Sequence, residues 1–403
     1  MTAPGPEAGR IGVFDGLRAF ALFGVVVVHL FGISGLLAVG DTGLKARAIW
    51  TVLGNTIDLF FVISGFLLFL PVLRRGRIKD GTGFFLLRRI VRIQPEYWLC
   101  LVAVTLMIVF IPVAFQPPVP SPAQFLIHVF DLQTVVRFFD PDFLIGFWID
   151  GALWMIPVIL GLYLVFPPFS RMMLKLPWAA LLLALAVTVG WKLAIHHLPG
   201  SFSWLAQGQA TEEQRMIIAV EQSPSFFWSF AAGMFAAMLY QKARLTPGSR
   251  WVTWGLPTAF FVATITWIAC GVAFSQEAVT STTGFDGSGL GRLLIVPNLL
   301  SSASRAVLVL FVALGPPLIQ RVFDNRAAAE GARLSYGLYL IHLPIAFYVG
   351  QLLQPPENGS LGAFLLWSVL VIPASLAWAW VSRRFAGKPA IDRTERHLAG
   401  RGN

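Results

Sequence analysis

Charge and cysteine are scarce in this sequence. Charged side chains make up only 12% of its 403 residues. Ordinary soluble domains carry roughly 25%, so a soluble globular enzyme is excluded. The two cysteines, Cys100 and Cys270, both fall inside apolar stretches. They therefore cannot form the disulfide framework of a small secreted domain, and we expect them to be packing residues.

Three further signals are missing. The opening residues, MTAPGPEAGRIGVF, lack a basic segment ahead of a short apolar core, so we expect no removable signal peptide. The sequence shows none of the alternating, turn-punctuated segments of a membrane β-barrel. No set of His, Cys, Asp and Glu has the spacing of metal ligands, so the sequence predicts no metal site.

Apolar residues are abundant and form 56% of the sequence. A membrane-spanning helix needs about 20 mostly apolar residues. Ten stretches approach this length: residues 13–37, 50–72, 93–114, 150–169, 177–196, 223–241, 251–273, 292–315, 334–352 and 361–382. The sequence therefore predicts an all-α, polytopic integral membrane bundle of about ten transmembrane helices. We expect a single domain over residues 1–403, with tails at 1–12 and 385–403.

The net charge of +10 is distributed unevenly. With the N-terminus in the cytoplasm, the basic residues gather in alternate connections: Arg74, Arg75, Arg77, Lys79, Arg88, Arg89 and Arg92, then Arg171 and Lys175, then Lys242, Arg244 and Arg250, then Arg321, Arg326 and Arg333, and finally the tail after Arg383. This asymmetry follows the positive-inside rule and predicts that both termini are cytoplasmic. We expect a multi-pass protein of the plasma (inner) membrane, with the lipid bilayer as a partner and no nucleic acid.

The first apolar stretch, DGLRAFALFGVVVVHL, carries polar residues on nearly one face. A helix advances about 100° and 1.5 Å per residue, so Arg18 and His29 share a face and lie roughly 16 Å apart along the axis. Asp15 lies near the same face. Titratable groups in a membrane helix normally face the bundle interior or a wet cavity. His29 is therefore a candidate base, although a structural hydrogen bond to another helix explains it equally well.

The second apolar stretch, NTIDLFFVISGFLL, contains a carboxylate at Asp58. Counting from the middle of each helix places Asp58 and His29 at similar depth. A carboxylate that faces an imidazole holds its tautomer and stabilises the imidazolium, as a general base requires. The alternative is that Asp58 caps its helix or pairs structurally near the outer end.

Two arginines, Arg89 and Arg92, precede the third stretch at the cytoplasmic start of its helix. Their spacing places them on one helix face, with Arg88 beside them. Guanidinium groups suit phosphates, while the alternative is a basic flank that binds lipid headgroups. Together with Arg18 and His29, these arginines describe a site for a long anionic ligand. Coenzyme A fits that geometry, because its phosphates lie at one end of a slender arm and its thioester at the other.

These stretches resemble the acyltransferase 3 family of integral membrane acyltransferases. The matching features are the arginine, ten residues and histidine from Arg18 to His29, DLFFVISGFLL at 58–68, the RxxR of Arg89 to Arg92, and LSYGLYLIHLPI at 334–345. The resemblance implies transfer of an acyl group, usually acetyl, from cytoplasmic acetyl-CoA to a hydroxyl of an envelope glycan, glycolipid or glycosylated metabolite. It also implies that His29 is the base and that Arg18, Arg89 and Arg92 serve the donor, with Asp15 and Arg88 beside them.

One segment departs from the family pattern. Members often carry Trp-Ser-Leu-x-x-Glu leading into Phe-Tyr and proline, whereas LWMIPVILGLYLVFPPF places Ile159 and Leu160 where the acid would fall. Asp150, about one helical turn before Trp154, is a candidate replacement.

The candidates for binding the acceptor are Ser64, Tyr97, Asp150, Trp154, Tyr163 and His342. For His342, a structural hydrogen bond to a neighbouring helix is an equally good explanation. The long, proline-rich connection 115–149 is a candidate wall or lid for the acceptor pocket.

The sequence favours general-base catalysis, in which neutral His29, oriented by Asp58, takes the proton of an acceptor hydroxyl that attacks the thioester. A covalent route through Ser64 or a tyrosine comes second, because no nucleophile has an activating base near it in sequence. The rival class is a transporter or flippase, in which His29, Asp58 and His342 relay protons or bind a cargo. A third possibility is a degenerate relative that binds the donor without transfer.

Overall fold

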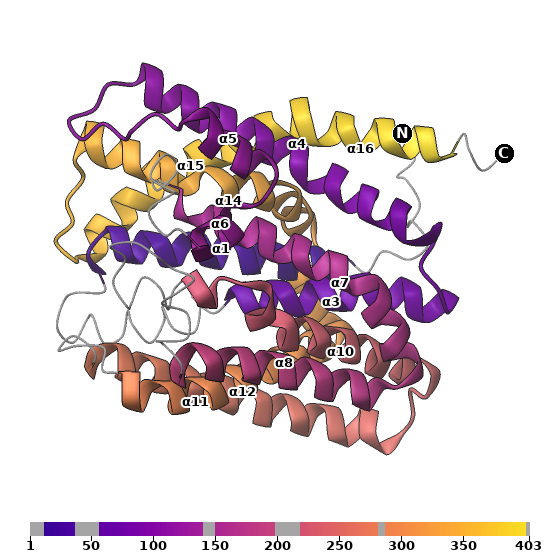
Figure 1. Cartoon of the computed structure of the whole chain (residues 1–403). Helices are drawn as coiled ribbons and strands as arrows, with labels where there is room; N and C mark the ends of the chain where they lie inside the picture. Colours follow the sequence, from indigo (N-terminus) through magenta and orange to yellow (C-terminus); the bar gives the residue numbers. More distant parts are fainter. Residues whose placement is uncertain (1–11, 37–55, 140–149, 198–217, 281–286, 400–403) are drawn as a thin grey trace.

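The computed structural model describes residues 12–36, 56–139, 150–197, 218–280 and 287–399 (Figure 1). Within these ranges the regular structure is helical and contains no β-strand, which confirms the expected all-α class. Parts of both expected tails, and residues 140–149 of the expected lid, lie outside the described residues.

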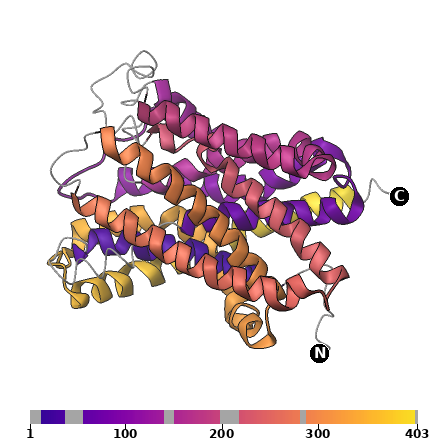
Figure 2. The same ribbon diagram turned by 90° about the horizontal axis from the view of Figure 1, so that it is seen from below.

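Ten long helices occupy the ten apolar stretches in the described part of the chain: α1 (Val13–Ile33), α3 (Thr56–Arg75), α4 (Gly81–Phe110), α7 (Met155–Lys175), α8 (Pro177–His197), α10 (Phe227–Leu245), α11 (Leu256–Thr280), α12 (Gly287–Leu314), α14 (Arg326–Leu353) and α15 (Leu361–Ser382). Nine of the ten stretches form helices long and apolar enough to cross a membrane, as judged over the same residues. The chain is therefore a multi-pass membrane protein. The long helices run roughly left to right in Figure 1, and Figure 2 shows α11 and α12 side by side across one face of the bundle.

The exception among the ten is α10, because its alanines, its glycine and its polar C-terminal end make it only weakly apolar. The surroundings of α10 explain how a weakly apolar helix is accommodated in the bundle. Most of its side chains are buried, and it contacts α3, α8 and α12. Since neighbouring helices rather than lipid cover this helix, its small residues serve close packing.

Helices α4 and α14 begin well before the apolar stretches that predicted them. Helix α4 starts at Gly81 rather than at residue 93, and α14 starts at Arg326 rather than at residue 334. The added turns carry charged side chains, among them Arg88 and Arg89 in α4 and Arg326 and Glu330 in α14. A search for apolar runs passes over such residues, although they are at home outside the hydrocarbon core. As a result, Arg89 and Arg92 lie within α4 and are held by a regular helix.

Helices α3 and α10 approach each other backbone to backbone through two glycines. A Cβ on Gly65 would overlap the carbonyl oxygen of Phe230, and a Cβ on Gly233 would overlap that of Val62. The absence of both side chains brings the two helices closer together than larger residues would allow. This contact fixes α3, the helix that carries Asp58.

Replacement of Gly233 by leucine should therefore destabilise the bundle by about 1–3 kcal/mol, the usual cost of overpacking. The measurement is the thermal unfolding midpoint of the purified protein in detergent. Gly190→Ala on α8 is the matched control, because a Cβ there meets no atom within 4 Å. It should leave the midpoint unchanged or raise it slightly. Equal midpoints for Gly233→Leu and the wild type would show that the contact tolerates a side chain.

Short helices lie between the long ones: α5 (Pro122–Val129), α6 (Gln133–Phe139), η3 (Gly151–Trp154), η5 (Ser223–Phe226), η6 (Trp251–Gly255), α13 (Pro317–Phe323), η8 (Arg383–Gly387) and α16 (Lys388–Ala399). The described part of the expected lid consists of α5 and α6. The region after residue 385, expected to be a tail, forms the end of η8 and then α16, and α16 contacts α4.

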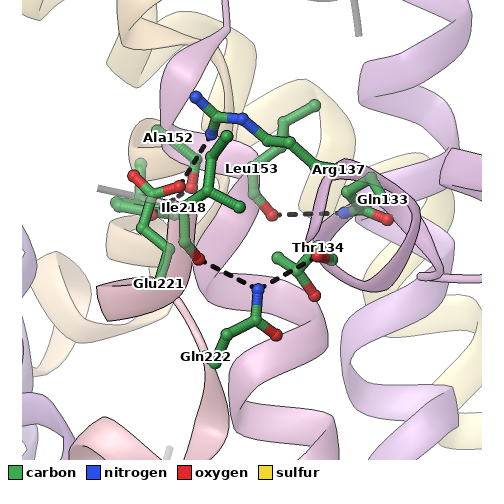
Figure 3. A network of polar contacts seen from close by, with 9 residues as sticks. Gln133, Thr134, Arg137, Ala152, Leu153, Ile218, Glu221 and Gln222 are labelled. Atoms are coloured by element: carbon green, nitrogen blue, oxygen red, sulfur yellow. Dashed lines mark hydrogen bonds and ion pairs between the residues drawn. The ribbon is translucent and has the colours of Figure 1, made fainter. Parts of the chain in front are cut away.

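A network of polar contacts joins the two long connections that precede α7 and α10 (Figure 3). Gln133 on α6 donates to a carbonyl of η3 at 3.3 Å, and Gln222 donates to the carbonyl of Thr134 at 3.0 Å. Arg137 pairs with Glu221 at 2.7 Å. Burial raises the pKa of Glu221 to about 7, while the guanidinium of Arg137 opposes that rise. These contacts hold α6 against the bundle.

Candidate active site

Two histidines from distant parts of the sequence meet inside the bundle. His29 on α1 is half-buried, and His342 on α14 is only 1% exposed. Nδ1 of His29 lies 2.8 Å from Nε2 of His342, and the two rings stack with their centroids 5.0 Å apart. His342 therefore makes an interhelical hydrogen bond, as one of the two explanations expected, and its partner is the candidate base itself.

The surroundings of the pair fix which nitrogens carry protons. Nδ1 of His342 lies 2.6 Å from the carbonyl oxygen of Tyr339, and because a carbonyl only accepts, this nitrogen is protonated. In the neutral ring Nε2 of His342 is then an acceptor, so Nδ1 of His29 must be the donor between the rings. Nε2 of His29 is left with a free lone pair, which is what a general base requires.

Asp58 does not contact His29. It lies in the first turn of α3, where its Oδ1 accepts from Ser229 at 2.9 Å and its Oδ2 lies 3.6 Å from Arg305. The expected hydrogen bond between Asp58 and His29 is therefore wrong, at least among the described contacts. Matching the depths of two helices placed Asp58 near His29, but depth does not say which face of α3 turns toward α1. The side chain that contacts the ring of His29 is instead that of His342.

The expected arginine cluster does assemble. Arg18 on α1 is close enough to Arg89 and Arg92 on α4 for their charges to interact, and Tyr163 and Asp15 act on it as well. The guanidinium of Arg89 stacks 5.7 Å above the ring of a phenylalanine, and its buried Nε has no hydrogen-bond partner in the described residues. Three like charges repel one another, so the cluster favours an anion among them.

Arg88 has a different role. It pairs with Asp80 at 2.9 Å and donates to the carbonyl of Lys79 at 2.8 Å. Asp80 and Gly81 both have positive φ, at 60° and 84°, in the tight turn between α3 and α4. Arg88 therefore braces the turn that joins α3 to α4.

A pocket of about 690 Å³ opens where α3, α4 and α16 meet. Basic and aromatic side chains contribute to its lining: Arg75, Lys79, Phe84, Phe85, Arg88 and Arg89. Glu395 and Leu398 of α16 close its far wall. Because Arg89 belongs both to this lining and to the arginine cluster, the pocket and the cluster adjoin.

Asp150 lies close to the histidine pair, because Tyr339 contacts both His342 and the segment that follows Asp150. Tyr339, whose carbonyl accepts from His342, donates its hydroxyl to the carbonyl of Ala152. Asp150 is buried beside Cys100, with its Oδ2 4.0 Å from Sγ, and its Oδ1 lacks a hydrogen-bond partner in the described residues. The structure thus places this carboxyl group next to the segment that holds His342.

The other acceptor-binding candidates are spread over the bundle. Tyr97 and Ser64 are buried on α4 and α3, and Trp154 stacks on a phenylalanine of η5 with 5.6 Å between the ring centroids. Tyr163 lies beside the arginine cluster instead. Ile159 is buried in the core, so an apolar side chain fills the place where the family pattern has an acid.

Residues 11–384 match the sequence model of a family described as an acyltransferase domain, the acyltransferase 3 family. The chain belongs to this family. It is therefore a membrane acyltransferase. Searches of curated proteins and of solved structures each gave no match. The acyltransferase 3 match contains His29, His342 and the arginine cluster, whereas Glu395 and Leu398 of the pocket wall lie beyond it.

Sequence reasoning passed over two charged residues of this acyltransferase. Arg305 on α12 is 1% exposed and Lys192 on α8 is 8% exposed, and both lie inside apolar spans. A lone cation within a membrane helix is a signal in itself, because it is costly and normally has a function. Asp58, which the sequence analysis did single out, is the carboxylate that faces them.

Proposed function

We propose that this acyltransferase moves an acyl group, in the simplest case acetyl, from cytoplasmic acyl-CoA to a hydroxyl of an envelope glycan, glycolipid or glycosylated metabolite. The observation that carries the proposal is the His29–His342 pair, which leaves a basic nitrogen on the same helix as the donor arginine Arg18. Eleven residues of α1 separate His29 from Arg18, or roughly 16 Å along the axis. A pantetheine arm has a comparable reach.

The donor end of this site is the arginine cluster and the pocket beside it. Guanidinium groups bind phosphate oxygens with paired hydrogen bonds, and Arg18, Arg89 and Arg92 supply three of them. The adjoining pocket offers further cations, and its two phenylalanines give a flat base a surface on which to stack. We infer that the phosphates and the base of coenzyme A occupy this end, which faces the cytoplasm of a plasma or inner membrane.

The chemistry follows from the free lone pair on His29. Nε2 takes the proton of the acceptor hydroxyl while the oxygen of that hydroxyl attacks the thioester carbonyl. Collapse of the tetrahedral intermediate then breaks the C–S bond. The imidazolium then returns its proton to the departing thiolate of coenzyme A. Throughout, Nε2 of His342 accepts the hydrogen bond from Nδ1 of His29, which holds the ring and stabilises its charged form.

His342 is thus a positioning residue, and its replacement should lower kcat while leaving the KM for acyl-CoA unchanged. We expect His342→Ala to reduce kcat about 10- to 100-fold, as loss of a supporting hydrogen-bond partner commonly does. His342→Gln should recover part of the loss, since its amide oxygen can accept from His29. A rise in KM for acyl-CoA, or no rescue by glutamine, would point to a packing role instead.

The proposed activity is tested with the full-length protein in lipid nanodiscs, supplied with radiolabelled acetyl-CoA and an extract of envelope glycans and lipids. Appearance of label in an acceptor, identified by mass spectrometry, supports acyl transfer. Binding of acetyl-CoA without label transfer to any acceptor would indicate a member of the family that has lost activity. Movement of a cargo across liposomes in the absence of acetyl-CoA would favour a transporter.

A further inference from the structure

A second group of buried charges lies away from the arginine cluster. It is built around Asp58 on α3, with Arg305 on α12, Ser229 on α10 and Lys192 on α8 as its neighbours. These charged and hydroxyl side chains are all at least nine-tenths buried. Asp58 and Arg75 stand seventeen residues apart near opposite ends of α3, or about 25 Å along its axis. This group is therefore separate from the pocket that Arg75 lines.

The hydrogen bonds in this group are unbalanced. Arg305 reaches Asp58 only at 3.6 Å, and neither of its terminal nitrogens has a hydrogen-bond partner in the described part of the chain. Ser229 already occupies the other oxygen of Asp58. Ser301 lies one helical turn before Arg305 on the same face of α12, and its buried hydroxyl also lacks a partner there. Hydrogen-bond donors thus outnumber acceptors.

The charges are unbalanced as well, because two cations, Arg305 and Lys192, face one carboxylate, that of Asp58, among the described residues. A buried donor without a partner costs about 1–3 kcal/mol. An unpaired buried charge costs more. Such groups persist inside membrane proteins where they line a pathway or a binding site. Within the described residues this site lacks a further acceptor with negative charge, and an oxyanion satisfies both the guanidinium and the hydroxyl.

We propose that Arg305, with Ser301 and Lys192, binds a single oxyanion, a phosphate or a carboxylate. The site lies toward the same end of the bundle as His29. A Cβ on Gly24 of α1 would touch Thr56 at 3.0 Å, and His29 is five residues further along α1. The anion is carried either by the acceptor or by a lipid headgroup. An anion carried by the acceptor presupposes the proposed acyl transfer, whereas the binding of an anion by Arg305 does not.

The test compares inorganic phosphate with chloride at constant ionic strength, using the full-length protein in a neutral maltoside detergent. A ligand that binds only the native state raises the unfolding midpoint, and we expect phosphate to raise it by about 2–4 °C in the wild type. Because the arginine cluster also favours an anion, the comparison is made in the Arg89→Gln background, where Arg305→Gln should abolish the rise that remains. The exposed Arg333→Gln in the same background should keep it. The measurement uses neither acyl-CoA nor acceptor. Absence of the phosphate effect would therefore count against the anion site and not against the proposed acyl transfer.

Asp58→Asn provides a second variant if Arg305→Gln does not fold. It removes the carboxylate that competes for Arg305, so the phosphate-induced rise should become larger. A rise that persists when Arg305→Gln is combined with Arg89→Gln, that disappears in Arg89→Gln alone, or that is unchanged in Asp58→Asn would overturn the proposal.

Nanodiscs identify the source of the anion once the phosphate effect is established. Phosphatidylglycerol should raise the midpoint over phosphatidylcholine alone, and should remove the phosphate effect, if a lipid headgroup supplies the anion. A phosphate effect that survives in phosphatidylglycerol assigns the site to the acceptor. In the Arg89→Gln background, Arg305→Gln should remove the competition between phosphatidylglycerol and phosphate, and competition that survives in that double variant would contradict the assignment of Arg305.

Discussion

Replacement of His29 by alanine should reduce acyl transfer by about 10²- to 10⁴-fold, the contribution typical of a positioned general base. The reason is that, in the proposed mechanism, Nε2 of His29 accepts the proton of the acceptor hydroxyl, while Nδ1 is held by His342. The measurement is the rate of label transfer from radiolabelled acetyl-CoA in a single turnover, which separates the chemical step from product release. Binding of acetyl-CoA should be unchanged, because the donor arginines are untouched.

The control for this substitution is His397→Ala, which removes an exposed histidine of α16 that does not line the pocket. It should transfer label at the wild-type rate. If His29→Ala retained full activity, another group would have to take the proton. If it lost acetyl-CoA binding and transfer to the same extent, His29 would serve binding rather than catalysis.

The fold was predictable because a bilayer leaves few choices. Backbone groups in hydrocarbon must be satisfied within the segment itself, so each long apolar run has to be a helix. The hydropathy of a stretch does not show whether lipid or protein covers the helix that it forms. Hydropathy therefore predicts α10, although protein covers that helix, but it misses the turns of α4 and α14 that precede their apolar stretches and carry charged side chains.

The faces of single helices were also predictable, whereas the pairing of helices was not. Helical spacing placed Arg18 and His29 on one stripe and Arg89 beside Arg92, and the structure gathers the three arginines. His29 meets a residue 313 positions further along the chain. No local pattern specifies such a contact. Position along the helix axis was the only guide, and it allowed Asp58 as well as His342 to be the partner of His29. Only the packing of α1 against α14 decides between them.

Other parts of the site were hidden for different reasons. A search for apolar runs averaged over the single charges of Lys192 and Arg305, although each was a signal. The pocket wall from α16 was assigned to a tail because its sequence is polar. Helix α16 is amphipathic, and Leu398 on its less polar side lines the pocket. Such a helix forms against the bundle rather than across the membrane.

Replacement of Arg89 by glutamine should weaken acyl-CoA binding by about 10- to 100-fold, since a hydrogen bond to a charged group contributes about 1.5–3 kcal/mol. Arg89 is the one arginine shared by the cluster and the described pocket, so in the proposed donor site it lies between the two groups of cations. The KM for acyl-CoA should rise while kcat at saturation stays close to that of the wild type, because His29 is intact. Arg333→Gln, which removes an exposed arginine paired with Glu330, is the matched control.

A shortened donor shows whether Arg89 acts through the phosphates. S-acetylpantetheine keeps the thioester and the arm but has no phosphate and no base, so the arginine cluster has nothing charged to hold. The wild type should use it poorly, and Arg89→Gln should use it no worse than the wild type does, because the interaction that the substitution removes is already missing. If Arg89→Gln impaired both donors to the same degree, the guanidinium would be supporting α4 rather than binding phosphate, and the donor site would have to be sought away from this end of the bundle.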